Sequence, residues 1–329
     1  MRDLGFSEEQ DEVLDFFRPK ISPRPLVRIG GDGDGAYLVP EDFKGVTDCF
    51  SPGVAESKTF EDDLLLHHGI HSHLLDLSAD PDSLSTLFLK GFQTFEPKWL
   101  GPQTEGDFLS LGDWVQAKAD PSGDLILQVD IEGGEFDVFQ SLSPDLLRRF
   151  RIIVVELHWV PSLLGSKDGV REVLTPLVKK LGRDFVTVHA HANNCCGERI
   201  PNGMNVFLPN IFELTLLRKD RFPAADVNRD FLAMTPHPLD IRKNTVSKPH
   251  LAFESGPGSP RQRFHSLSRS LWHFCEDLFD PRVSNIALVL SLRAYVRWRK
   301  RSRTVLDLLY KRIYVRFFRV PLSLDRGDS

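Results

Sequence analysis

Cysteine is scarce in this sequence. There are four in 329 residues, and two of them, Cys195 and Cys196, are adjacent. Such a set offers no disulfide framework, so a reducing, cytoplasmic compartment is expected. No uninterrupted apolar run approaches the roughly 20 residues that a membrane-spanning helix needs. The first eighteen residues are acidic and amphipathic rather than basic and then apolar, so no signal peptide is expected.

Positive charge is scarce in the first 258 residues. This part has 26 Lys and Arg against 40 Asp and Glu, a net charge of −14, whereas residues 259–329 have 15 against six, a net charge of +9. An acidic main body is a poor surface for a phosphate backbone, so no nucleic-acid partner is expected. The basic segment is predicted to be a separate region.

The glycine-rich segment at residues 30–35 lacks the lysine of a phosphate-binding P-loop. Short apolar runs flank it at residues 26–29 and 36–39, which predicts a β-hairpin with an acidic turn. Before the hairpin, Ser7 and Gln10 have the spacing of a helix capping box. Residues 1–45 are therefore predicted to form a helix and a hairpin that together cap the main domain.

From residue 46 onward, strand-like and helix-like segments alternate. Strands are expected at residues 46–50, 71–77, 92–95, 125–129, 151–158, 185–194, 204–208 and 211–217. Helices are expected at residues 59–68, 81–89, 136–142, 144–150 and 170–181, and a helix or turn at 109–119. This alternation predicts an α/β fold with a Rossmann-like, doubly wound, mostly parallel sheet, whose last strands are suited to an antiparallel edge.

One stretch of the sequence combines an apolar strand pattern with a group of acids. Residues 125–135, Leu-Ile-Leu-Gln-Val-Asp-Ile-Glu-Gly-Gly-Glu, are a buried strand that ends in the acids Asp130, Glu132 and Glu135. In open α/β sheets the carboxyl ends of the strands face the ligand crevice, where carboxylates meet a substrate. A purely structural interpretation also stays open, in which Asp130 ends the strand and Glu135 favours the following helix dipole.

Two other predicted strands also end in chemically active groups: Glu156 and His158 on one, His189 and His191 on the other. If the strands are neighbours, these side chains converge with Asp130. A divalent metal site is one interpretation, because histidine and carboxylate are suitable ligands. A metal-free site, in which His158 or Glu156 removes a proton from a hydroxyl, is the second. Satisfied polar groups at a sheet edge are the third.

Asp76 lies near the end of the predicted strand at residues 71–77. An acid at this position, some twenty residues beyond the loop at 51–57, is suited to accept hydrogen bonds from the ribose hydroxyls of a nucleoside cofactor. The alternative is a surface aspartate before a turn.

In their order and spacing, these segments resemble the FkbM-type methyltransferases, which use S-adenosylmethionine on a Rossmann-like sheet. The resemblance extends over about residues 27–220. Its most specific part is residues 129–138, supported by motifs at residues 28–37, 51–54, 60–61, 155–158, 191–194 and 213–215.

The resemblance implies a role for each of several residues. Ser51, Gly53 and Glu61 belong to the segments that bind the cofactor, Asp76 is expected to bind the ribose, and Asp130 to line the site near the sulfonium. The chain departs from the family in three places: Gln128 stands where a lysine is frequent, Ala55 where a second glycine is common, and Gly35-Ala36 where a glycine pair is more usual.

The predicted function is therefore S-adenosylmethionine-dependent O-methylation of a sugar or glycan hydroxyl, with Asp130, Glu156 and His158 as the candidate catalytic groups. Two alternatives remain. One is a non-catalytic binding or scaffold protein that kept the sheet, and the other is a metal-dependent hydrolase using His189 and His191 as ligands.

Four regions are predicted: residues 1–45, a methyltransferase domain at 46–220, an irregular connection at 221–260, and a basic helical appendage at 261–329. The last region interleaves apolar residues with arginine at helical spacing. This pattern is typical of an amphipathic helix on an anionic membrane surface. It equally suits helices that pack on the acidic body or on a second subunit.

Overall fold

The computed structural model describes residues 7–204, 206–224, 232–233, 236–240 and 244–245. All of them belong to one of the chain's two units, Met1–Gln262. The predicted appendage at residues 261–329 and most of the connection at 221–260 lie outside the described residues. In the part that is described, no helix is long and apolar enough to span a membrane.

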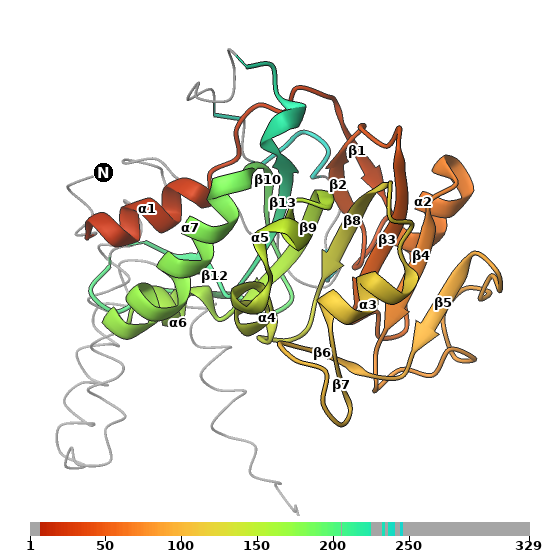
Figure 1. The fold of residues 1–329 in the computed structure, drawn as a ribbon. Helices are drawn as coiled ribbons and strands as arrows, with labels where there is room; N and C mark the ends of the chain where they lie inside the picture. Colours follow the sequence, from red (N-terminus) through yellow and green to blue (C-terminus); the bar gives the residue numbers. More distant parts are fainter. Residues whose placement is uncertain (1–6, 205, 225–231, 234–235, 241–243, 246–329) are drawn as a thin grey trace, which may run out of the picture. The chain divides into compact units, whose positions relative to one another are not determined.

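A seven-stranded sheet lies at the centre of this unit (Figure 1), with the strand order β10-β13-β9-β8-β3-β4-β5. All neighbouring strands are parallel except β13, which runs antiparallel to both β9 and β10. This confirms a mostly parallel, Rossmann-like sheet with an antiparallel C-terminal strand. The strands are β3 (Val46–Pro52), β4 (His71–Leu75), β5 (Gln93–Glu96), β8 (Asp124–Val129), β9 (Phe150–His158), β10 (Phe185–Ala192) and β13 (Ile211–Arg218).

The strand order reverses between β3 and β8. From β3 the chain proceeds outward through β4 to β5, and it then returns to the other side of β3 to form β8 and β9. In open α/β sheets, ligands bind at such a switch point, outside the carboxyl ends of the strands. The loops that follow β3 and β8 therefore border the expected binding crevice.

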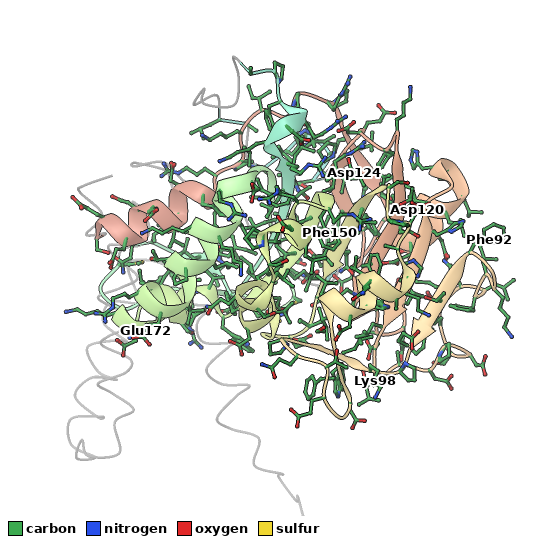
Figure 2. All side chains as sticks on the ribbon, in the orientation of Figure 1. Phe92, Lys98, Asp120, Asp124, Phe150 and Glu172 are labelled. Carbon is green, nitrogen blue, oxygen red and sulfur yellow. The ribbon has the colours of Figure 1, made fainter. Side chains whose placement is uncertain are left out.

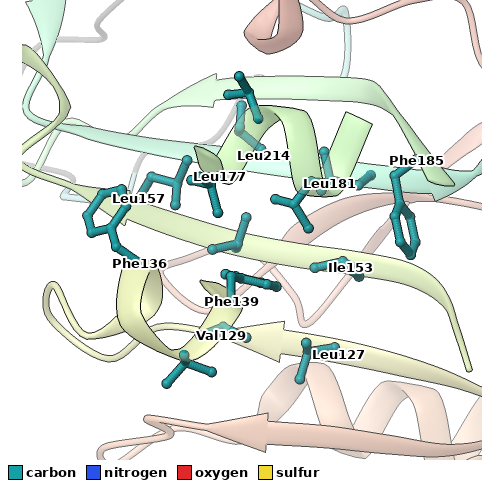
Figure 3. Close-up of a cluster of buried hydrophobic side chains, with 14 of the residues drawn as sticks. Leu127, Val129, Phe136, Phe139, Ile153, Leu157, Leu177, Leu181, Phe185 and Leu214 are labelled. Carbon is teal, nitrogen blue, oxygen red and sulfur yellow. The ribbon is translucent and has the colours of Figure 1, made fainter. Parts of the chain in front are cut away.

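Helices cover one face of the sheet and bury the larger core. Figure 3 shows Phe136 and Phe139 of one helix, and Leu177 and Leu181 of another, packed on the strand residues Leu127, Val129, Ile153 and Leu157. The helices on this face are α1 (Glu8–Phe17), α3 (Leu111–Lys118), α4 (Glu135–Ser141) and α7 (Thr175–Asp184), with the shorter α5 (Pro144–Leu147), α6 (Val160–Leu164) and a π-helical turn at Gly169–Leu174 that continues into α7.

The hairpin of β1 (Leu26–Ile29) and β2 (Tyr37–Pro40) covers the other face together with α2 (Thr59–His68). Side chains of a strand alternate between the two faces. In β9, Ile153 and Val155 enter the core under the helices, whereas Ile152 and Val154 enter the core under the hairpin. The same alternation places Glu156 and His158 on the hairpin side of the sheet.

Most predicted elements are present with the expected bounds. The helix at residues 59–68 ends, as expected, at Gly69, which adopts a left-handed conformation with φ +68°. In α1 the capping box forms, because Ser7 Oγ accepts a hydrogen bond from the backbone N–H of Gln10 at 3.2 Å. The sequence pattern does not predict the short strands β6 (Trp99–Gly101), β7 (Phe108–Ser110) and β11 (Glu198–Arg199), or the 3₁₀ turn at Lys219–Arg221.

Two predictions about strands were wrong. The last strand, β13, does not lie at an edge but between β9 and β10, and seven of its eight residues are buried. Its near-continuous apolar sequence suits this interior position better than an edge. The segment at residues 204–208 forms no strand in its described part apart from the two-residue β12 (Leu208–Pro209), which pairs with β11.

The helix predicted at residues 81–89 was also wrong, because this segment consists of turns and bends. Side chains of α2 and of the residue before it hold the segment. The fully buried Lys58 donates from Nζ to the carbonyl of Leu87 at 2.9 Å and pairs with Asp62, which also accepts a hydrogen bond from Thr86. These contacts between distant residues outweigh a weak helical propensity.

Candidate active site

The loop after β3 packs directly against the loop after β8. Gly53 has φ +85°, and a Cβ atom there would lie 1.6 Å from the carbonyl oxygen of Asp130. The backbone N–H of Gly53 donates to the carbonyl of Leu75 at 2.9 Å, and that of Asp130 donates to Pro52 at 3.3 Å. Only glycine permits this approach of the two loops at the switch point.

Asp76 anchors the same loop from the end of β4. Its Oδ2 accepts a hydrogen bond from the backbone N–H of Ala55 at 2.9 Å. Its Oδ1 accepts from the backbone and hydroxyl of Ser78, both at 2.7 Å, and from Ala79 at 3.2 Å. Since a carboxylate oxygen has two lone pairs, only Oδ2 keeps capacity for a further donor. The ribose-binding role of Asp76 stays a prediction.

Ser51 and Glu61 are buried beneath the loop and begin a chain of polar contacts. The Ser51 hydroxyl bonds the Glu61 carboxyl and also donates to Gln128 Oε1 at 2.8 Å. Gln128 donates from Nε2 to the Tyr37 hydroxyl at 3.2 Å, and this hydroxyl donates to Glu156 Oε1 at 3.0 Å. The chain thus links α2 to β9 under the hairpin.

Glu61 has an altered acidity. Burial raises its pKa to about 7, and the hydrogen bond from Ser51 opposes this increase only in part. The serine hydroxyl has one proton, and the carboxyl of Glu61 and the amide oxygen of Gln128 are both within its reach as acceptors.

Glu156 lies at the centre of an acidic cluster. Its carboxylate and ligand atoms of Asp130 and His158 all lie within 4.8 Å of one another, as do those of Asp34, Glu156 and Glu213. In the sheet Glu156 stands opposite Glu213. The structure therefore brings together the three predicted catalytic residues from two neighbouring strand ends, and adds two further carboxylates.

Glu135 is not only a helix-terminal residue. Its Oε1 accepts a hydrogen bond from Nδ1 of His158 at 2.9 Å, and both side chains are buried. The Oε1 atom also accepts from the backbone N–H groups of Ile131 and Gly133. The opposite ring nitrogen of His158, Nε2, lies 3.4 Å from Glu132 and 3.8 Å from Asp130. Glu135 thus fixes the orientation of His158 toward the acids.

Acids at the amino ends of the parallel strands have different partners from acids at the carboxyl ends. At the amino ends of the parallel strands, where Figure 2 labels Asp124 and Phe150, Asp124 pairs with Arg151 and Arg218. At the carboxyl ends, none of the cluster's acids forms an ion pair with lysine or arginine within the described residues; these acids are Asp34, Asp130, Glu132, Glu135, Glu156 and Glu213.

The acidities follow this difference. Burial raises the pKa of Asp124, but its two arginine partners lower it below the usual value overall. Burial raises the pKa of Asp130 to about 7, with further increases from Glu132 and Glu135 and opposition from His158. Burial and the neighbouring acids raise the pKa of Glu156 as well. Perturbed pKa values of this kind are typical of functional sites.

The strained backbone conformations also lie at the carboxyl ends of the strands. Ala55, Glu132 and Trp159 are the three non-glycine residues with positive φ in the described part of the chain, at 46°, 55° and 59°. They follow β3, β8 and β9, respectively. Left-handed backbone costs a residue with a side chain roughly 1–2 kcal/mol and tends to mark functional sites.

The two predicted histidine ligands on β10 lie elsewhere. His189 Nε2 is 3.1 Å from Asp240, and His191 contacts both Asp240 and Asn244. Together with Glu213, Tyr37 and Arg28 they line a small polar cavity beside the hairpin. Within the described residues these histidines have two carboxylates beside them, Asp240 and Glu213, and neither histidine belongs to the group formed by Asp130, Glu156 and His158.

The sequence predicts no catalytic role for four residues of this site: Tyr37, Glu135, Glu213 and Asp34. Tyr37 and Asp34 belong to the glycine-rich hairpin motif and Glu213 to a motif of the last strand, but the motifs alone do not indicate what these side chains do. Glu213 stands opposite both Glu156 and His191 in the sheet, which makes it the most direct addition to the predicted set.

A Rossmann-like sheet with a glycine loop and an acidic cluster at its switch point is typical of an enzyme that binds a nucleoside cofactor. Residues 67–185 match the family model of the methyltransferase FkbM domain. The match confirms the resemblance over this segment and indicates a methyltransferase. It includes Asp76, Asp130, Glu156 and His158 but not the loop at residues 51–57. The chain has no match among curated proteins.

The loop after β3 allows a paired test of backbone conformation. Gly53→Ala is expected to destabilise the fold by roughly 3 kcal/mol, because it combines a left-handed conformation with a steric clash. Ala55→Gly relieves strain at a neighbouring position and is expected to change stability by less than about 1 kcal/mol. Unfolding in denaturant measures both values; equal stability of Gly53→Ala and the unmodified protein would contradict the proposed loop contact.

The acidity of Glu61 predicts a dependence of stability on pH. In the folded protein its pKa is about 7 against an ordinary value of 4.5, so its contribution is complete below pH 4.5 and is lost as the pH rises through about 7. Glu61→Gln should therefore flatten the fall in unfolding free energy between pH 5 and pH 8, by up to about 3 kcal/mol. Denaturant titrations at both pH values measure it, with the exposed Glu105→Gln as the control; an unchanged slope would refute the raised pKa of Glu61.

Proposed function

We propose that the protein transfers a methyl group from S-adenosylmethionine to a hydroxyl group of a sugar or glycan. The observation that supports this best is the acidic cluster at the switch point, where the buried carboxylates form no ion pair with a lysine or arginine of the described residues. A methyl sulfonium is positively charged, and the product S-adenosylhomocysteine is neutral at sulfur. An acidic site favours the binding of the first and the release of the second.

The residues present fit such a cofactor. Gly53 lets the loop after β3 pack directly on the backbone of Asp130, so the loop and this acid lie side by side at the switch point. Asp76 keeps one acceptor position at Oδ2, and Oδ1 of Asp130 is buried without a hydrogen-bond donor among the described residues. We propose that this loop and these two acids hold the cofactor, which supplies a methyl group already activated for transfer.

The protein must then align the acceptor oxygen and stabilise it as it loses its proton. Asp130, Glu156 and His158 are the groups proposed for this task. Glu135 orients His158, while Tyr37 and Asn193 bond the two oxygens of Glu156. Side chains that are held in this way need little rearrangement during the reaction.

Trp159 supports a carbohydrate acceptor. It follows His158 directly, its side chain is 53% exposed, and its backbone is held in a strained conformation. An exposed aromatic ring beside a polar cluster is suited to bind the apolar face of a sugar ring. We therefore propose that Trp159 is part of the acceptor site.

Binding of the cofactor is the first test. Isothermal titration of the full chain with S-adenosylhomocysteine should give one site, and Asp76→Asn should weaken it at least tenfold, because the substitution removes an anionic acceptor and an anchor of the loop. Asp82→Asn, an exposed aspartate of the next turn, is the control. If the unmodified chain releases no heat with either cofactor form, the scaffold alternative is favoured instead.

The acceptor half has a separate test. In a methyl-transfer assay with a panel of glycans, Trp159→Ala should raise the KM for the acceptor several-fold and leave kcat nearly unchanged, because a stacking contact acts before and during the reaction alike. Phe92→Ala removes an equally exposed aromatic ring at the other edge of the sheet and should change neither constant. Equal effects of the two substitutions would argue against a stacking role of Trp159.

A further inference from the structure

We infer that Asp130, Glu156 and His158 form a binding site for one divalent first-row metal ion such as Mn²⁺. The inference concerns cation binding by residues of this chain. Only the role of the ion in catalysis, given below, rests on the proposed methyl transfer.

The spacing of the three residues suits a shared cation. Metal bonds to nitrogen and oxygen of about 2.1–2.4 Å, set at right angles, place neighbouring ligand atoms about 3.0–3.4 Å apart. His158 Nε2 lies 3.8 Å from Asp130 Oδ1, and the ligand atoms of all three residues lie within 4.8 Å of one another.

His158 provides a second, independent observation. Its side chain is 2% exposed, and Nε2 makes no hydrogen bond within the described residues, although Nδ1 does. A carboxylate partner at Nδ1 favours a proton on that nitrogen, which leaves a lone pair on Nε2. Nε2 faces carboxylate oxygens of Glu132 and Asp130, at 3.4 and 3.8 Å, so a bound cation would take the place of a proton on this nitrogen.

The surroundings of these ligands also match those of a metal site. A histidine that binds metal usually donates its other N–H to a carboxylate, and ligating carboxylates are themselves hydrogen-bonded. Glu135 accepts the other N–H of His158. Tyr37 and Asn193 donate hydrogen bonds to the carboxylate of Glu156 at 3.0 and 3.2 Å.

The chemistry of the donors selects the ion. One imidazole nitrogen with two carboxylates, and no thiolate, suits Mn²⁺ or a neighbouring first-row ion better than Ca²⁺, which takes oxygen ligands, or structural Zn²⁺, which prefers sulfur and additional nitrogen. If the methyl transfer proposed above takes place, a cation at this position would stabilise negative charge on the acceptor oxygen. Glu132, whose side chain is 83% exposed, is placed to pass the hydroxyl proton to solvent.

The test is a titration of the EDTA-treated full chain with MnCl₂, in which electron paramagnetic resonance measures the free hydrated ion. One Mn²⁺ per chain is expected. Asp130→Asn and His158→Gln should each weaken binding at least tenfold, since each removes one of three ligands. The control is His191→Gln, because this histidine also contacts a carboxylate but lies outside the site. Circular dichroism and thermal unfolding verify that each variant is folded.

Two results would overturn the inference: no depletion of free Mn²⁺ by the unmodified chain, or binding that folded Asp130→Asn and His158→Gln leave unchanged. A parallel titration with S-adenosylhomocysteine in EDTA separates this site from the proposed function. Mn²⁺ binding without cofactor binding would keep the metal site and refute the methyltransferase. Cofactor binding without Mn²⁺ binding would refute the metal site and leave the proposed methyltransferase in place.

Discussion

The burial of carboxyl groups that form no ion pair with lysine or arginine in the described part of the chain is the constraint on which this structure depends. Tyr37 of the hairpin β1–β2 contacts Glu156 at the carboxyl end of β9, and both Glu156 and Glu213 are buried there. Carboxylates in such a place must be hydrogen-bonded, protonated or bound to a cation. Tyr37 and Asn193 provide hydrogen bonds to Glu156, and the raised pKa values of Glu156 and Glu213 favour protonation. A bound ligand would supply the cation.

The residues at the amino ends of the parallel strands contribute to stability, whereas those at the carboxyl ends form the candidate site. At the amino edge, arginine pairs hold Asp42 and Asp124 and depress their pKa values, which stabilises the folded state at neutral pH. At the opposite edge, the raised pKa values of Asp130 and Glu213 mean that ionisation opposes folding. A fold can retain such a cost where it serves binding or catalysis. The strained backbone after β3, β8 and β9 lies at this same edge.

Local patterns predicted much of this arrangement. Apolar runs that end in acids located Asp130, Glu156 and His158, because the carboxyl ends of parallel strands meet at one edge. The contact between Tyr37 and Glu156 joins residues 119 positions apart, and no local pattern reports it. The position of β13 depends on which strands it joins, and the segment at residues 81–89 depends on Lys58, the buried residue that precedes α2. Each of these features depends on contacts between distant segments, which propensity and periodicity do not describe.

Gln128 shows how a departure from a family pattern can be structurally consistent. A lysine here would place a positive charge beside Ser51 and Tyr37 and, through them, beside Glu61 and Glu156. The amide instead accepts from Ser51 and donates to Tyr37, so it continues the hydrogen-bonded chain without adding charge. Glu61 keeps its raised pKa of about 7, and no lysine or arginine among the described residues forms an ion pair with the carboxylates of the cluster. The positive charge that this edge of the sheet lacks is therefore best supplied by what it binds, whether a sulfonium or a metal ion.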